Sequence, residues 1–326
     1  MKQRTVPLGK TEIRITPVGL GTWQFSGGKG MAGSFWKAIP PDITNEIVKN
    51  ALEGGINWFD TAEAYGRGHS EASLAKALKT HNISPDDVVI ATKWWPLFRR
   101  AKNMLRTVDD RLHHLNGYGI DLFQVHTPFG FSPVEAEMKA MARLAEQGKI
   151  RSVGVSNFSA NQMVRAHKTL RKMGLTLASH QVKYSLLDRK IEKNGILQTA
   201  KKLGITLIAY SPLEQGILTG KFHRDPDRIR FTGYRKWRKL FHRPALQKTL
   251  PLIRLLEEIA ENHGTTPAAI ALHWTIRFHG DTVVAIPGAS KPGHIQAHSE
   301  AMRIDLGEEE LHQINATSKT VCRELS

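Results

Sequence analysis

The chain has 326 residues, of which 40% are hydrophobic and 23% charged, and its net charge at pH 7 is +16. This composition is that of a globular protein and excludes disordered and fibrous classes, and no segment is long and apolar enough to span a bilayer. The positive charge indicates a polyanion, an anionic membrane surface or a phosphate-rich small molecule as partner, without choosing among them.

The first eight residues include basic side chains but no apolar stretch follows them, so we expect no secretory signal. The sequence has one cysteine, Cys322, which cannot form an intramolecular disulfide. A reducing, cytoplasmic setting fits that count.

The chain begins with two short extended runs, 5–8 and 12–16, which flank Gly9-Lys10-Thr11 and predict a β-hairpin. Strands are predicted from short apolar runs at 18–21, 56–60, 88–93, 122–126, 150–155, 177–182, 205–210 and 282–286. Helices are predicted from amphipathic spacing at 43–52, 70–78, 104–115, 134–147, 161–172, 191–203, 250–262 and 267–277.

Eight strands that alternate with helices over this length predict an α/β protein, a closed (α/β)8 TIM barrel behind an N-terminal hairpin. No change in composition divides the chain, so we expect one domain over residues 1–326. An open dinucleotide-binding sheet would need Gly-x-Gly-x-x-Gly after its first strand, and the run 19–24 lacks the third glycine.

A long basic loop, residues 221–248, is predicted after the seventh strand. It holds ten Lys or Arg residues against two Asp, with aromatic residues between them. Three interpretations remain open: a solvated loop, a surface for single-stranded nucleic acid, or a mouth loop whose charge faces cofactor phosphates. We rank nucleic-acid binding last, because the loop belongs at the barrel mouth.

Ionisable residues end three of the predicted strands: Asp60, Lys93 and His126. Tyr65 follows the first of them after a short loop. In a parallel barrel the carboxyl ends of the strands meet at one mouth, so these four side chains should converge there. Each residue alone has a structural explanation, such as a helix cap or a core histidine, and only the four together indicate an active site.

The chemistry assigns each residue type a role. A lysine ammonium favours the anionic form of a nearby tyrosine, and a carboxylate such as Asp60 holds that lysine by a charge-assisted hydrogen bond. His126 could donate a hydrogen bond to a carbonyl oxygen. The group therefore suits protonation of an oxygen that gains negative charge, as in carbonyl reduction beside a hydride donor.

At these residues the chain resembles the aldo-keto reductases. The resemblance runs from VGLGTW (18–23) to IPG (286–288), and it rests on NWFDTAEAYG (57–66), ATK (91–93), VH (125–126), GVSNF (154–158) and AYSPL (209–213). It implies an (α/β)8 barrel whose catalytic tetrad is Asp60, Tyr65, Lys93 and His126, with Tyr65 as general acid. It also implies reduction of a small carbonyl substrate.

The resemblance further implies NADPH across the barrel mouth. The cofactor residues that it implies are Gly21, Thr22, Trp23, Asp60, Ser156, Asn157, Gln181, Tyr210, Ser211, Leu213, Gly216, Leu218, Gly288, Ser290, Lys291, His294 and His298. His294 and His298 depart from the arginine or glutamine and the asparagine frequent at these positions, so NADH is not excluded. The family resemblance extends to potassium-channel β subunits, which makes a cofactor-binding regulatory subunit the alternative function.

Aromatic residues beside the strand ends, Trp23, Trp94 and Phe129, are predicted to line the substrate pocket, with Trp95 as a further candidate; packing in the core is the alternative for Trp95 and Phe129. No metal site is expected, because His113 and His114 are adjacent on a predicted helix and cannot share one face. The sequence does not name the substrate or set the oligomeric state.

Overall fold

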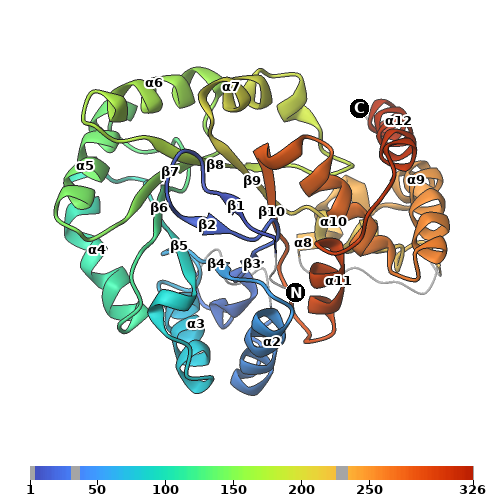
Figure 1. The fold of residues 1–326 in the computed structure, drawn as a ribbon, viewed down its shortest axis with the longest axis horizontal. Helices are drawn as coiled ribbons and strands as arrows, with labels where there is room; N and C mark the ends of the chain where they lie inside the picture. Colours follow the sequence, from blue (N-terminus) through green and yellow to red (C-terminus); the bar gives the residue numbers. More distant parts are fainter. Residues whose placement is uncertain (1–3, 31–36, 225–233, 326) are drawn as a thin grey trace.

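The computed structural model describes residues 4–30, 37–224 and 234–325, and its centre is a ring of parallel strands (Figure 1). The strands are β3 (Leu20–Gly21), β4 (Trp58–Asp60), β5 (Val89–Trp94), β6 (Leu122–Val125), β7 (Ser152–Ser156), β8 (Leu177–Lys183), β9 (Thr206–Tyr210) and β10 (Val283–Ile286). They pair in chain order. Parallel bridges from Val18 to Ala285 and from Gly21 to Gly288 join the first and last strands. The predicted (α/β)8 barrel is confirmed.

The predicted hairpin lies across one end of this barrel (Figure 1). Its strands β1 (Val6–Pro7) and β2 (Arg14–Ile15) pair antiparallel. Val6 and Ile15 are buried in one apolar cluster with Trp58 and with inward residues of the barrel strands. Because the hairpin covers the amino ends of the strands, the opposite mouth is left for the functional site.

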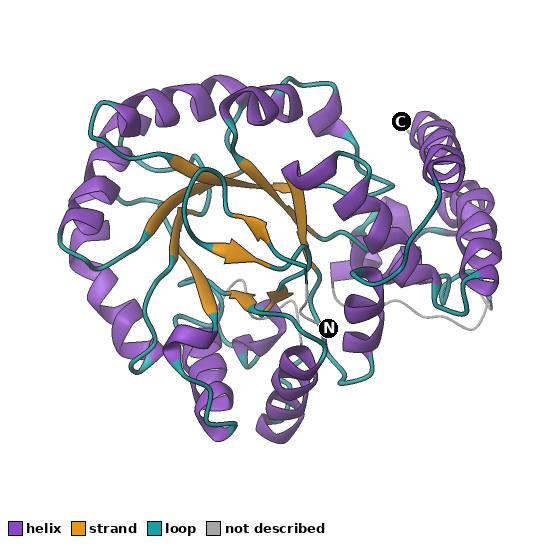
Figure 2. Cartoon of the chain, viewed as in Figure 1, coloured by secondary structure: helices purple, strands orange, loops and turns teal. Residues whose placement is uncertain are grey.

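Helices surround the strands (Figure 2). They are α2 (Pro41–Glu53), α3 (His69–Thr80), α4 (Ala101–Leu115), α5 (Val134–Glu146), α6 (Ala160–Arg171), α7 (Ile196–Leu203), α10 (Pro267–Arg277) and α11 (His294–Ala301). Their buried faces are the apolar stripes seen in the sequence, and they differ from the predicted ranges by a few residues at most ends. A C-terminal helix that was not predicted, α12 (Glu308–Leu325), packs beside α9 (Arg243–Asn262).

The basic loop is shorter than predicted, because α9 already begins at Arg243. The described part contains the short helices α8 (Tyr234–Trp237) and η5 (Lys239–Phe241), and the short helix η4 (Glu214–Thr219) precedes the loop. Apolar side chains from η4 and η5 pack with Phe222 in a small separate core. Residues 225–233, with the predicted basic positions 228 and 230, lie outside the described residues.

Among the described residues, no helix has the length and apolar character needed to cross a membrane.

Candidate active site

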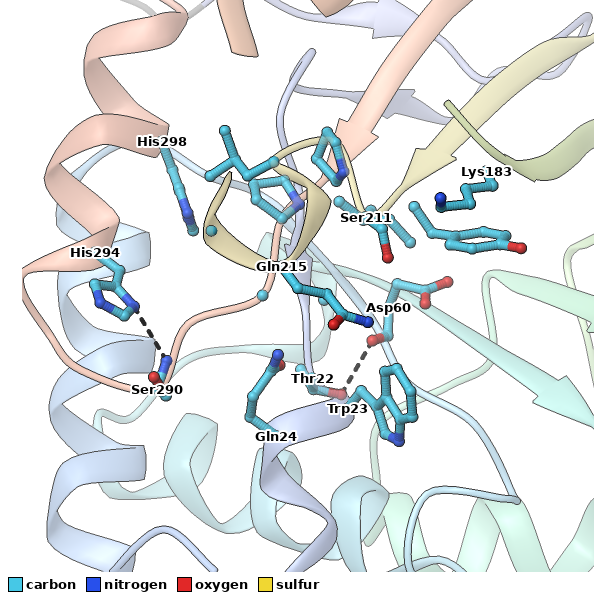
Figure 3. A pocket seen from close by; sticks show the side chains of 18 of the residues that line it. Thr22, Trp23, Gln24, Asp60, Lys183, Ser211, Gln215, Ser290, His294 and His298 are labelled. Carbon is cyan, nitrogen blue, oxygen red and sulfur yellow. Dashed lines mark hydrogen bonds between the residues drawn. The ribbon is translucent and has the colours of Figure 1, made fainter. Parts of the chain in front are cut away.

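A cavity of about 750 Å³ opens at the carboxyl ends of the barrel strands. Residues at the ends of β3, β4, β7, β8, β9 and β10 line it, and loop residues from the insertion after β9 and from α11 extend it to one side. Figure 3 shows Asp60 and Trp23 in one part of this cavity and His294 and His298 in another. The cavity is therefore elongated, with the strand-end carboxylate in one part.

Asp60 and Lys93 form a fully buried ion pair. Lys93 Nζ also donates to the Thr61 carbonyl at 2.8 Å. Burial alone would lower the pKa of Lys93, but attraction by Asp60 and Tyr65 outweighs it, so that pKa is raised. Lys93 is thus held as a buried ammonium beside Asp60 and Tyr65, which line the cavity.

Tyr65 lies above this lysine, with its hydroxyl 3.4 Å from Lys93 Nζ. The tyrosine ring stacks on Trp23, with the centroids 5.9 Å apart. Burial raises the pKa of Tyr65, and the opposing effect of Lys93 is smaller. Lys93 does favour the phenolate, as the sequence predicts, but burial has the larger effect on the pKa, so Tyr65 keeps its proton and is available as an acid.

His126 completes the group on the other side of Tyr65, at 5.7 Å between ring centroids, and Trp95 packs edge-on against it. Burial, with a smaller contribution from Lys93, lowers the pKa of His126 well below its usual value. The ring is neutral and lines the cavity. The structure therefore brings the four predicted catalytic residues together, with a protonated phenol and a neutral imidazole facing one space.

Polar residues predicted to hold the nicotinamide carboxamide, Ser156, Asn157 and Gln181, also line this cavity, next to Tyr210. The Tyr210 hydroxyl donates to Asn157 Oδ1 at 2.9 Å, and Asn157 Nδ2 donates to Ser156 Oγ at 3.0 Å. Asn157 has a positive φ of 61°, and Ser211, which follows Tyr210, has a positive φ of 52°. Strained backbone of this kind concentrates at ligand sites, and the amides and hydroxyls present fit a carboxamide.

Cationic and histidine side chains gather in the part of the cavity beside α11. His294 and Lys221 line it, and Lys291 stands in the turn before α11. Burial, together with repulsion from Lys221 and Lys291, lowers the pKa of His294. His298 is 1% exposed and its Nδ1 has no hydrogen-bond partner among the described residues. An unpartnered buried nitrogen and mutually repelling cations fit an anionic, hydrogen-bonding ligand, as a phosphorylated adenosine would be.

Most of the predicted cofactor residues line the cavity: Gly21, Thr22, Trp23, Asp60, Ser156, Asn157, Gln181, Tyr210, Ser211, Leu213, Gly216, Gly288, Ser290, His294 and His298. Two do not. Leu218 is fully buried in the core, and Lys291 is exposed on its turn.

Two predicted substrate-pocket residues also need correction. Trp94 is fully buried on the outer face of β5, where its indole donates to Asn103 Oδ1 at 3.0 Å. It points away from the cavity because it follows the inward Lys93, and successive strand residues face opposite sides. Phe129 is 66% exposed and does not line the cavity, whereas Trp23 and Trp95 do.

Gln124 and Lys183 were missed as parts of the site. Gln124 Nε2 and Gln181 Nε2 both donate to Asp60 Oδ2, at 3.2 and 2.8 Å. Lys183 lines the cavity and pairs with Glu214 at 2.6 Å. Both could have been predicted from strand alternation, in which residues two apart face the same side. Gln124 lies two residues before His126, and Lys183 lies two residues after Gln181.

Comparisons with known proteins agree with this geometry. The sequence model of the Aldo/keto reductase family matches residues 17–319. Aldo-keto reductase YhdN of Bacillus subtilis is 34% identical over 94% of this chain and 91% of its own. The NADH-specific methylglyoxal reductase of Escherichia coli is 29% identical over 94% and 95% of the two chains. The solved structure of glycerol dehydrogenase AKR11B4 from Gluconobacter oxydans is 31% identical, with a TM-score of 0.84 over 99% and 97% of the two chains.

Proposed function

Because the chain belongs to the aldo/keto reductase family, whose members are oxidoreductases that act on carbonyl compounds, we propose that it reduces aldehydes or ketones to alcohols with NADPH. Tyr65 is the general acid in this proposal. The observation that carries it is the position of Tyr65 at the cavity wall, with its hydroxyl 3.4 Å from the Lys93 ammonium and its ring centroid 5.7 Å from that of His126.

The nicotinamide, when bound, supplies the hydride. Tyr65 donates its proton to the carbonyl oxygen as negative charge develops there. Lys93 stabilises the resulting phenolate, since its ammonium is held by Asp60 and by the Thr61 carbonyl. The neutral His126 donates an N–H to the same oxygen and orients the substrate.

The cation group beside α11 supports NADPH as the cofactor. Burial lowers the pKa of Lys221, and the nearby Arg235 and Lys291 lower it further. A 2′-phosphate between Lys221, Lys291 and His294 would relieve this repulsion, and NADH offers no such group. One relative is named NADH-specific, so the preference for NADPH over NADH is proposed separately from the carbonyl reduction and has its own test.

The general-acid assignment is tested with Tyr65→Phe, which removes only the hydroxyl. Oxidation of NADPH is followed by absorbance with a panel of aromatic aldehydes, quinones and ketoses. We expect the rate to fall on the order of 10²- to 10⁴-fold, with NADPH affinity unchanged. A near-normal rate would contradict the role of Tyr65. Tight NADPH binding by the wild type without turnover of any substrate would instead favour a regulatory subunit.

The cofactor assignment is tested by fluorescence titration of the wild type and Lys221→Ala with NADPH and NADH. We expect NADPH affinity to fall roughly tenfold, the effect of losing one charge-assisted contact of about 1.4 kcal/mol. NADH affinity should change much less. Lys201→Ala, an exposed lysine at the other end of the barrel, is the matched control. Equal losses for both cofactors would refute the 2′-phosphate contact.

A further inference from the structure

Three aromatic side chains project into solvent beside the cavity mouth. Phe98 is 75% exposed, Phe129 66% and Phe131 62%. They come from the loops after β5 and β6, and the Phe98 and Phe131 ring centroids are 6.0 Å apart. Large exposed apolar side chains that gather in one place usually mark an interaction site.

The two loops hold these rings outward in a defined conformation. The Phe131 amide donates to the Arg99 carbonyl at 2.8 Å, which joins the loops to each other. Arg99 is anchored by an ion pair with Glu63. Phe98 has a positive φ of 59°, a conformation that costs energy in a bulky residue and is kept only where the surroundings impose it. The exposure is therefore built into the loops.

Basic side chains border the aromatic group. Arg100 and Lys102 stand exposed at the start of α4, and Arg106 lies one turn further on. None of these three forms an ion pair within the described part of the chain. The nearby Glu135 is already neutralised by two hydrogen bonds from Arg165, both at 2.8 Å. The border consequently carries net positive charge.

A second segment of the same character lies at the same end of the barrel. Trp237 is 80% exposed on the insertion after β9, and Lys236 and Lys239 beside it are exposed. Both segments follow the carboxyl ends of strands, so they flank the cavity mouth. The partner must therefore accept aromatic side chains and carry negative charge over a broad area.

We propose that this end of the barrel docks on an anionic lipid bilayer. The rim surface, defined as Phe98, Phe129 and Phe131 with Arg100 and Lys102, makes the central contact. The phenyl rings enter the headgroup and acyl boundary, while the two cations pair with lipid phosphates. A second copy of the chain fits less well, because each copy carries a net charge of +16 and repels another.

The test is co-sedimentation of the full chain with vesicles of equimolar phosphatidylglycerol and phosphatidylcholine, compared with vesicles of phosphatidylcholine alone. We expect binding to the anionic vesicles that weakens as salt is added. The triple variant Phe98→Ser/Phe129→Ser/Phe131→Ser should lose at least about tenfold in partitioning. Arg100→Gln/Lys102→Gln should lose about 25-fold, since each basic residue near the surface contributes about fivefold.

Matched controls come from the opposite end of the barrel. Lys201→Gln/Lys202→Gln changes the net charge equally, and Met173→Ser removes an apolar residue that is 43% exposed. Both should bind vesicles within about twofold of the wild type, and NADPH affinity reports that every variant is folded. Absence of wild-type binding, or equal losses in rim and control variants, overturns the proposal. So does a triple variant that leaves vesicle binding unchanged but abolishes a dimer seen by sedimentation velocity.

Discussion

Removal of one charge from the buried ion pair should cost much stability, and removal of both should cost little. Lys93→Met leaves the Asp60 carboxylate 1% exposed, with hydrogen bonds from Gln124 and Gln181 but no counter-charge. Breaking a buried pair in this way costs about 3–5 kcal/mol. Lys93→Met/Asp60→Asn has no unpaired charge, so most of the lost stability should return.

The expected loss of stability can be expressed as a fall in melting temperature. An unfolding entropy of about 2.1 cal/mol/K per residue gives about 0.7 kcal/mol/K for the 326-residue chain. Dividing about 3–5 kcal/mol by this value predicts that Lys93→Met melts about 4–7 °C below the wild type. The double variant should melt within about 2 °C of it.

The assay is thermal unfolding followed by far-ultraviolet circular dichroism, with carbonyl reduction measured on the same samples. Both variants should be inactive, because neither keeps the ammonium beside Tyr65. If the double variant melts as low as or lower than Lys93→Met, the unpaired charge is not the cause of the loss, and the reasoning is refuted.

Two further predictions concern pH and stability, each measured by urea unfolding at pH 5 and at pH 7 or 8. Burial lowers the pKa of His180 to about 3, and its Nε2 accepts from the Phe158 amide at 3.0 Å. Below about pH 6.5 the unfolded chain binds a proton at His180 and the folded chain does not, so the free energy of unfolding decreases as the pH is lowered. His180→Gln should reduce the loss of stability between pH 7 and pH 5 by about 2 kcal/mol. Burial raises the pKa of Glu137 to about 8, so the folded chain alone keeps that proton between pH 4.5 and 8 and stability falls as pH rises. The free energy of unfolding of Glu137→Gln relative to the wild type should therefore increase by about 3 kcal/mol from pH 5 to 8. For either variant, a stability difference from the wild type that does not change with pH would contradict the pKa shift of the residue replaced.

The strand positions and the convergence of Asp60, Tyr65, Lys93 and His126 could be predicted because their signals are local. An apolar run that ends in Asp60, Lys93 or His126 places its last residue at the barrel mouth, whatever the loops do. Side-chain direction was less secure. The position of Trp94 beside a strand end predicts a pocket residue, but Trp94 follows the inward Lys93, and period-two alternation alone places it against α4.

The pKa of Tyr65 depends on tertiary packing and could not be predicted from nearby residues in the sequence. Proximity to Lys93 suggested a lowered pKa, but the packing around Tyr65 makes burial the larger effect and raises it. Burial depends on every element that closes over the phenol, including Trp23 from the loop after β3 and His126 from the end of β6. The total burial of the phenol cannot be predicted from the spacing of residues in the sequence.

The sequence by itself determined the eight-stranded barrel, the hairpin that closes one end and the four residues at the other. These follow from hydrophobic periodicity and from the geometry that every parallel barrel shares. Only the tertiary structure decided which loop residues reach the cavity, that Lys183 pairs with Glu214 there, and that Phe98, Phe129 and Phe131 face solvent. Those outcomes depend on contacts between segments distant in the chain, where the local pattern allows several conformations and packing selects one.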